Sequence, residues 1–435
     1  IPNTYFIYPN FAVFLRVLVI FDPSNEQTPN VLYRRIIQPI LFSMNIERAH
    51  RTVMLLLRIT GALPGGRWLL RKLYATEHPA LEREVFGLRF PNPVGLAAGF
   101  DRNGEAFREL AALGFGFIEI GTVTPRPQSG NPRPRVFRLP RDKAIVNRMG
   151  LCNRGLEKTI SMLRKPHEGI LVGCNIGKNT VTPPENAPAD YLKVFRNLYE
   201  YADYFTVNIS CETGNRECSA HTRENITRIL APLFDFRRGQ NQYRPILLKI
   251  SPDLPDEAVD AVTDTMISTP LDGIVATNGT YSREGLRTSR TTIGKIGNGR
   301  LSGQPLTRRA VEVVRRIRER SGGAYPIIGV GGLMSPDDVR AMLDAGASLV
   351  QLYTGYIYEG PRLLRKICRR LIADASPPTA TADLSPAAPT DLPSAPATPA
   401  APPKMPQTPQ AASATETAET EGRGSASTAP EPSEK

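Results

Sequence analysis

Short apolar runs alternate with helical stretches along the chain from residue 91 onward. Each run ends in polar or glycine residues, as a buried parallel strand does where it enters a loop. The apolar runs span Pro93–Gly99, Phe117–Thr122, Ile170–Gly177, Tyr204–Ser210, Ile246–Ser251, Gly273–Asn278, Pro326–Gly332 and Leu349–Gly355. The helical stretches span Glu105–Leu113, Asn153–Leu163, Ala189–Tyr201, Thr222–Phe236, Asp256–Ile267, Pro305–Arg320, Ser335–Ala345 and Pro361–Ile372. Eight such units predict an α/β fold, a (β/α)8 TIM barrel, and their near-regular spacing favours closure over a doubly wound sheet.

Before the barrel, residues 32–60 predict two helices with apolar stripes flanked by arginine. The stripes are Ile36, Ile37, Ile40, Leu41 and Met44 in the first helix, and Val53, Met54, Leu56, Leu57 and Ile59 in the second. The basic residues around them are Arg34, Arg35, Arg48, Arg51, Arg58, Arg67, Arg71 and Lys72. This pattern suits a hairpin in a membrane interface, and it suits equally a hairpin packed on the barrel with a solvated basic face. No run of about 18 uncharged apolar residues codes an ordinary membrane-spanning helix.

The two ends of the chain differ in composition from the barrel. Residues 1–30 contain one short apolar stretch, Phe11–Phe21, which fits the remnant of a signal or of an anchor. Residues 376–435 hold 13 of the 40 prolines, and so few large apolar side chains that burial cannot offset the ordering entropy. We therefore expect an N-terminal segment of unassigned role (1–30), a helical domain (31–76), a barrel (77–375) and a disordered tail (376–435).

The charge balance points to an anionic partner. The whole chain carries a net charge of +12, and the tail contributes 3 basic and 7 acidic residues, or −4, so residues 1–375 carry +16. A folded part this basic favours nucleic acid, a phosphate-bearing cofactor, an anionic substrate or anionic lipid as its partner.

The five cysteines do not indicate a disulfide framework. Their number is odd and their spacing irregular, which favours a reducing compartment. The grouping of Cys211, Cys218 and His221 raises the possibility of a metal site, but its spacing matches no common zinc site and a fourth ligand is missing. We therefore expect no metal.

In a (β/α)8 barrel the chemistry takes place at the C-terminal ends of the strands. The predicted strand ends are Ala98-Gly99, Thr122, Asn175, Asn208, Lys249, Thr277-Asn278, Gly331-Gly332 and Tyr353-Thr354-Gly355. The last two follow the seventh and eighth strands, where backbone N–H groups commonly hold a phosphate because glycine allows close approach. The sequence therefore predicts a phosphate site there.

Polar side chains at the same rim suggest the rest of the ligand. Four asparagines, Asn147, Asn175, Asn208 and Asn278, lie at or near strand ends, and their carboxamides would suit a planar heterocycle with alternating C=O and N–H edges. Lys249 could offset negative charge on a flavin, form a Schiff base or make a salt bridge within the barrel. A cysteine just after a strand, such as Cys211, acts as a base or nucleophile if its pKa falls, but most single cysteines only pack.

Several of these strand ends lie in longer stretches that resemble the quinone-dependent (class 2) dihydroorotate dehydrogenase family. The resembling stretches are Asn92–Asp101, Gly114–Gln128, Pro132–Pro140, Asn147–Gly150, Asn175–Asn179, Val207–Ser210, Leu301–Gly303, Pro326–Gly332 and Ala345–Gly355. The similarity runs from about residue 33 to 372. It includes Glu47–His50 in the N-terminal hairpin, the element that separates class 2 from the soluble class 1 enzymes.

The resemblance implies FMN-dependent oxidation of (S)-dihydroorotate to orotate in de novo pyrimidine biosynthesis, with a membrane quinone as electron acceptor. FMN would be held by Ala98, Gly99, Arg102, Thr122, Asn175, Asn208, Lys249, Thr277, Gly303, Gly332, Tyr353 and Thr354. Dihydroorotate would be bound by Arg102, Asn147, Arg148, Met149, Gly150, Leu151, Asn208 and Asn278. His50 and Arg138 match residues near a quinone tunnel roofed by the hairpin. The family also implies peripheral association with the cytoplasmic side of a cell inner membrane, or with the mitochondrial inner membrane in a eukaryote, and neither nucleic acid nor metal.

The sequence departs from the family pattern at the site itself. Arg102 replaces the usual Lys, which keeps the charge but changes the geometry. Cys211 stands where class 2 usually has Ser and class 1 uses Cys. The remaining departures are Glu212-Thr213 for Pro-Asn, Gly279 for Thr, Cys152 for Asn and Arg300 for Gly. These changes bear on substrate and rate more than on fold or flavin.

In the mechanism that the resemblance implies, Cys211 removes the C5 proton while a hydride passes from C6 to the flavin. Lys249 then offsets the charge of the reduced flavin. Two alternatives stay open from the sequence: a lyase or aldolase that uses Lys249 as a Schiff-base residue, and a flavin-binding relative with a changed substrate.

Overall fold

The computed structural model describes residues 33–167, 169–209 and 221–375. Eight parallel strands close into a barrel in the order β10-β12-β13-β3-β4-β7-β8-β9. These are β3 (Val94–Leu96), β4 (Phe117–Val123), β7 (Leu171–Ile176), β8 (Tyr204–Asn208), β9 (Ile246–Ile250), β10 (Gly273–Ala276), β12 (Ile327–Val330) and β13 (Leu349–Leu352). The last strand pairs with the first, Val350 opposite Val94, so the predicted closed barrel is confirmed.

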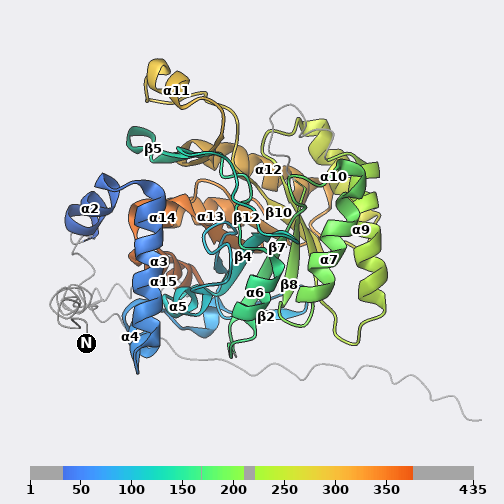
Figure 1. The fold of residues 1–435 in the computed structure, drawn as a ribbon, viewed down its shortest axis with the longest axis horizontal. Helices are drawn as coiled ribbons and strands as arrows, with labels where there is room; N and C mark the ends of the chain where they lie inside the picture. Colours follow the sequence, from blue (N-terminus) through green and yellow to red (C-terminus); the bar gives the residue numbers. More distant parts are fainter. Residues whose placement is uncertain (1–32, 168, 210–220, 376–435) are drawn as a thin grey trace, which may run out of the picture. The chain divides into compact units, whose positions relative to one another are not determined.

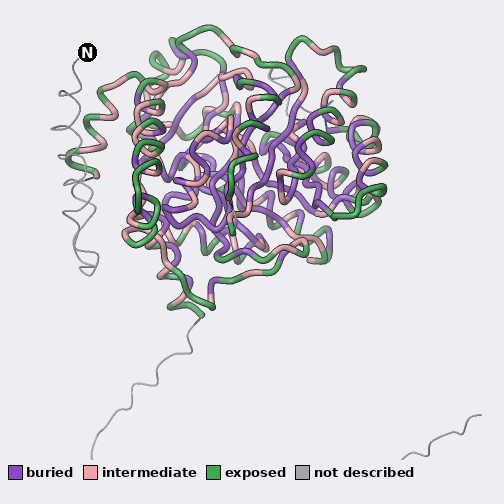
Figure 2. Tube along the Cα trace, turned by 60° about the horizontal axis from the view of Figure 1, so that its bottom comes forward, coloured by how far each residue is buried: buried purple, intermediate pink, exposed green. Residues whose placement is uncertain are grey.

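Helices surround the barrel at the stretches that the sequence predicted to be helical (Figure 1). They are α5 (Phe107–Ala112), α6 (Gly155–Leu163), α7 (Ala187–Leu198), α9 (Arg223–Arg238), α10 (Asp256–Ile267), α12 (Thr307–Arg320), α13 (Pro336–Asp344) and α15 (Arg362–Ala375). Local signals set their starts. The hydroxyl of Ser335, for example, accepts the Asp338 N–H at 3.2 Å and caps α13, with Pro336 in its first turn. Figure 2 shows that buried residues concentrate on the strands and on the inward sides of these helices.

Inside the barrel the side chains change from apolar to polar along each strand. Phe117, Leu247 and Leu349 pack in one buried cluster near the strand starts. Because side chains on one face recur at every second residue, Glu119, Lys249 and Gln351 follow them on the same face, and all three are buried. A polar layer therefore lies between this apolar floor and the C-terminal mouth.

Two small antiparallel sheets accompany the barrel, and the sequence analysis did not predict either. The hairpin of β1 (Arg83–Val85) and β2 (Leu88–Phe90) packs Val85 and Phe90 into the apolar floor. The sheet of β5 (Val136–Leu139), β6 (Ala144–Asn147) and β11 (Arg300–Gly303) lies with α11 (Arg290–Ile296) at the opposite end of the barrel (Figure 1). The remaining short elements are α14 (Thr354–Glu359), η2 (Pro79–Leu81), η3 (Pro140–Asp142), η4 (Pro184–Asn186) and η6 (Gln304–Leu306).

The predicted N-terminal helices are present, with one more than expected. A π-helical turn η1 (Tyr33–Ile37) leads into α2 (Gln38–Ser43), followed by α3 (Ile46–Ala62) and the unpredicted α4 (Gly66–Tyr74). Ala49, Met54 and Leu70 are buried, so the helices pack on the barrel domain. Among the described helices none is long and apolar enough to cross a bilayer alone. Only α3 and α4 taken together reach that length and composition, and they are bent by 114° at their junction.

Candidate active site

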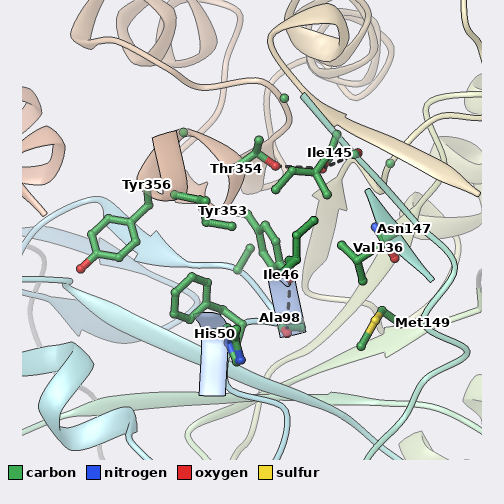
Figure 3. Close-up of a pocket in the computed structure, with 18 of the residues that line it drawn as sticks. Ile46, His50, Ala98, Val136, Ile145, Asn147, Met149, Tyr353, Thr354 and Tyr356 are labelled. Carbon is green, nitrogen blue, oxygen red and sulfur yellow. Dashed lines mark hydrogen bonds between the residues drawn. The ribbon is translucent and has the colours of Figure 1, made fainter. Parts of the chain in front are cut away.

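A cavity of about 1340 Å³ joins the N-terminal helices to the C-terminal mouth of the barrel. Its apolar end is lined by α3 and α4, and its polar end by the strand ends, as the close-up in Figure 3 shows for His50, Asn147 and Tyr353. Every predicted site residue that the structure describes lines this cavity: His50, Ala98, Gly99, Arg102, Thr122, Arg138, Asn147, Arg148, Met149, Gly150, Leu151, Asn175, Asn208, Lys249, Thr277, Asn278, Gly303, Gly332, Tyr353 and Thr354. The predicted base Cys211 and the altered loop after it lie outside the described residues.

Side chains at the ends of β4, β7 and β8 form a hydrogen-bond chain, which we call the amide chain. The Asn208 Nδ2 donates to Thr122 Oγ1 at 3.2 Å, and the Thr122 hydroxyl donates to Asn175 Oδ1 at 2.6 Å. The Asn175 Nδ2 then donates to the carboxylate of Glu119 at 2.9 Å. Both asparagines are thus held in one orientation at the wall of the cavity that they line.

Lys249 brings a buried cation to the same mouth. Its side chain is 5% exposed, and among the described residues its ammonium forms no hydrogen bond or ion pair. Burial lowers the pKa of Lys249, and the negative charge of Glu119 counteracts part of that fall. An ammonium left without a direct anion in a buried cavity is suited to a ligand that carries or develops negative charge.

The glycines after β12 and β13 create the close backbone approach that the sequence predicted. Gly332 has a φ of 71°, and a Cβ there would lie 2.5 Å from the backbone nitrogen of Thr307. The first turn of α14 starts at Thr354, so its first N–H groups lack partners within the helix. Ser302 and Thr354 place their hydroxyls 2.8 Å apart beside it. These donors fit a phosphate group.

Two pairs of the unusual residues contact each other. Arg102 Nη1 lies 2.8 Å from the Cys152 Sγ at the cavity wall. Arg300 Nη1 donates to the Gly279 carbonyl at 3.1 Å, and a Cβ on Gly279 would lie 3.1 Å from the Arg300 Cβ and 2.9 Å from the Leu301 carbonyl oxygen. Geometry therefore couples Gly279 to Arg300, because a larger residue at 279 would need the neighbouring strand to move.

The guanidinium of Arg148, one of the residues predicted to bind substrate, is held by the protein itself. Its Nη1 donates to the carbonyls of Ile296 at 2.6 Å and Asn298 at 2.8 Å, and its Nη2 donates to that of Pro134 at 3.1 Å. These bonds tie the loop at residues 147–151 to the C-terminal end of α11 and to the loop before β5. The guanidinium of Arg148 is thus anchored by three backbone carbonyls.

The two predicted quinone-site residues lie between the barrel and the N-terminal helices. His50 Nε2 is 2.9 Å from the Phe100 carbonyl oxygen, and burial together with the charge of Arg102 lowers the pKa of His50 to about 4. Arg138 donates to the carbonyls of Leu41, Phe42 and Met44 at 2.8 to 3.1 Å. His50 is therefore neutral at physiological pH, and Arg138 holds the end of α2.

The sequence analysis assigned no role to two carboxylates that make several hydrogen bonds near the site. Glu47 on α3 accepts hydrogen bonds from Arg133 at 3.0 Å and from Arg135 at 2.9 and 3.1 Å, which anchors the helix to the loop before β5. Glu119, at 0% exposure, anchors the amide chain. A charge between apolar neighbours in the run Phe117-Ile-Glu-Ile120 was the available signal, since a buried carboxylate requires partners.

The metal hypothesis receives no support within the part of the chain that the structure describes, where no cluster of three or more His, Cys, Asp or Glu could hold an ion. Cys211 and Cys218, two members of the grouping considered from the sequence, lie outside those residues, while His221 is described and buried.

The fold and the site together define a (β/α)8 barrel whose mouth suits a planar, phosphate-bearing ligand and opens into an apolar channel. Comparison with known proteins specifies this class further. Residues 80–374 match the family model of dihydroorotate dehydrogenase. The chain therefore belongs to the dihydroorotate dehydrogenase family, as its motifs suggested.

Individual relatives agree with this family. A dihydroorotate dehydrogenase (quinone) of Christiangramia forsetii is 45% identical over 341 residues, covering 78% of this chain and 99% of the relative. One of Thermosynechococcus vestitus is 46% identical over 367 residues, covering 80% and 98%. The crystal structure of the Eimeria tenella enzyme in complex with ferulenol superimposes with a TM-score of 0.69 at 31% identity, covering 77% of this chain and 94% of that one. These similarities favour the oxidoreductase over the aldolase alternative.

Proposed function

We propose that this protein oxidises (S)-dihydroorotate to orotate, with FMN as the bound cofactor and a membrane quinone as the electron acceptor, in de novo pyrimidine biosynthesis. One observation carries the proposal: a single cavity extends from the polar barrel mouth to an apolar end lined by α3 and α4. A polar substrate and an apolar oxidant can then reach one cofactor from different directions.

The residues at the mouth fit FMN. The phosphate would lie on the backbone around Gly332 and Thr354, and the isoalloxazine edge would meet Asn175 and Lys249. FMN held there would supply a hydride acceptor for the substrate and an electron donor for the quinone. The protonated ammonium of Lys249 stabilises negative charge at this edge, since it has no competing anion in direct contact among the described residues.

Dihydroorotate would be positioned by amides and one guanidinium. Asn147, Asn208 and Asn278 line the same part of the cavity and match the alternating C=O and N–H edge of the substrate ring. Arg102 would bind the carboxylate of the substrate. Cys211 would accept the C5 proton as the C6 hydride leaves, so that the ring gains its double bond.

The outer surface of the N-terminal helices supports peripheral membrane binding. Large apolar side chains there are exposed: Ile36, Ile40, Leu55, Ile59, Leu63 and Trp68, which is 64% exposed. The same surface carries exposed basic side chains on α3 and α4, which would meet anionic lipid headgroups: Arg48, Arg51, Arg58, Arg67, Arg71 and Lys72. This arrangement would place the apolar end of the cavity at the surface of a cell inner membrane on its cytoplasmic side, or of the mitochondrial inner membrane in a eukaryote.

The test is spectroscopic and separates the two halves of the reaction. Purified protein is expected to be yellow, and dihydroorotate added without oxygen is expected to bleach the flavin absorbance. A short-chain quinone in detergent should then restore it. A colourless protein, or a yellow protein that dihydroorotate leaves unchanged, would remove the proposal. The second result would favour a flavin-binding relative with a changed substrate.

A further inference from the structure

Glu119 is a fully buried carboxylate that does not line the cavity and that the proposed reaction does not touch. It accepts hydrogen bonds from Asn175 Nδ2 at 2.9 Å, Gln351 Nε2 at 2.7 Å and the Tyr204 hydroxyl at 3.2 Å. Three donors from β7, β13 and β8 converge on it, which is the environment that an ionised acceptor requires in a barrel interior. Burying a carboxylate in the core costs free energy, which indicates that Glu119 has a role.

The first consequence of Glu119 is directional. Because a carboxylate only accepts, the Asn175 amide must turn its Nδ2 toward it and its Oδ1 toward the Thr122 hydroxyl. The hydroxyl proton is then committed to Asn175, so Thr122 can only accept from Asn208. The carboxylate beneath the mouth therefore fixes which way each polar group of the amide chain faces.

The second consequence is electrostatic. Burial lowers the pKa of Lys249, which lies on β9. The negative charge of Glu119 raises that pKa and so opposes the effect of burial. Glu119 also acts on Tyr204 of β8 and Cys174 of β7. Burial and the charge of Glu119 raise the pKa of Tyr204, and burial with the charges of Asp203 and Glu119 raises that of Cys174, so both stay neutral. Glu119 and Lys249 are then a buried charge pair without direct contact in the polar layer, and only Lys249 lines the cavity.

We propose that Glu119 is a positioning residue for the reaction: it sets the orientation of the amide chain and supplies the negative charge that accompanies Lys249 at the flavin edge. This inference deepens the proposed function and rests on it, because FMN is the ligand toward which both effects are directed. Glu119 itself touches neither FMN nor substrate.

The substitution Glu119→Gln separates charge from hydrogen bonding. The new glutamine keeps an oxygen that accepts from the Asn175 amide. Its N–H groups can donate to Gln351 Oε1, which is buried and has no partner among the described residues. The fold should therefore survive while the charge is lost. Tyr204→Phe is the matched control, because it removes one hydrogen bond from the same carboxylate and leaves the charge. Glu119→Leu removes both.

The midpoint potential of bound FMN, followed by its visible spectrum as a function of pH, reports on Lys249 without turnover. Without the charge of Glu119, Lys249 should lose its proton at a lower pH, and above that pH the flavin loses its neighbouring cation. We expect the potential to begin to fall more steeply at a lower pH in Glu119→Gln than in the unsubstituted protein. In Tyr204→Phe that pH should stay in place. Flavin reduction by dihydroorotate should lose its alkaline activity over the same interval.

Affinity for FMN tests the directional part. Apoprotein titrated with FMN should bind it at least about tenfold more weakly in Glu119→Leu, in which the Asn175 amide is no longer oriented, and nearly normally in Glu119→Gln. Identical pH curves for Glu119→Gln and the unsubstituted protein would overturn the inference even if Glu119→Leu failed to fold. A protein that never takes up FMN would overturn the proposed function as well, and the first spectrum distinguishes the two failures.

Discussion

The contact that holds α3 on the barrel domain can be broken with one substitution, Glu47→Ala. The Glu47 carboxylate accepts from Arg135 through Nε and Nη2, and the side chains are 15% and 6% exposed. Removing one partner of a buried pair costs about 3–5 kcal/mol. Arg135 keeps its bonds to the carbonyls of Ser129 and Asn131, so we expect the lower end, about 3 kcal/mol.

This loss should appear as local opening of the N-terminal helices. About 3 kcal/mol corresponds to a rise of roughly 100-fold in the population with α3 undocked. Hydrogen exchange followed by mass spectrometry should show α3 amides exchanging faster by that factor, while the barrel strands are unchanged. Quinone reduction should slow more than flavin reduction by dihydroorotate, because α3 lines only the apolar end of the cavity.

A matched control exists on the neighbouring helix. Glu77 pairs with Arg71 at 2.6 Å, but the side chains are 64% and 65% exposed, so Glu77→Ala should cost no more than about 0.5 kcal/mol. Equal exchange in the two variants would refute the reasoning. The hydrogen bonds and charges of Arg135 and Arg133 outweigh burial and hold the pKa of Glu47 below its ordinary 4.5. The stability that Glu47 contributes is therefore complete above pH 4.5 and is lost only as the pH falls through the lowered value.

Three further outcomes are expected. Gly279→Thr should destabilise the fold by about 1–3 kcal/mol, and Arg300→Gly in the same chain should recover part of that loss in a double-mutant cycle measured by urea unfolding; simple additivity would contradict the contact. His50→Gln should flatten the rise of folding stability between pH 4 and 6.5. The folded protein holds the His50 pKa at about 4, so His50 costs stability as the pH drops below its unfolded value of 6.5. An unchanged slope would show that His50 is not buried as described. Trp68→Ser combined with Leu55→Ser should weaken sedimentation with anionic vesicles at least about tenfold at unchanged flavin content, and undiminished binding would remove these side chains from the membrane contact.

The sequence predicted the barrel well because its determinants are local and repeated. Each strand is a buried apolar run of a few residues that ends in glycine or a polar residue, and each helix has its own apolar face and start signal, as Ser335 and Pro336 illustrate. The strand ends followed from the same pattern. Since parallel strands all end at one mouth, Asn175, Asn208 and Lys249 had to meet once the barrel closed.

What the sequence did not predict depends on contacts between distant segments. The strands β5, β6 and β11 are four residues each and lie in connections between barrel units, so no periodicity marks them. The pairings of Glu47 with Arg135 and of Gly279 with Arg300 join positions separated by 88 and 21 residues. Glu119 was visible as a charge in a buried run, but only the fold shows that three donors converge on it.

The central claim, one cavity with a polar end for the substrate and an apolar end for the quinone, is tested most directly by filling the apolar end. Ala49 on α3 is 5% exposed and lines that end, so Ala49→Phe fills it without touching the barrel mouth. In anaerobic stopped-flow, dihydroorotate should still bleach the flavin at the normal rate, while reoxidation by a short-chain quinone should slow at least about tenfold relative to Ala49→Ser. Quinone reoxidation at the rate of Ala49→Ser would contradict the route through α3.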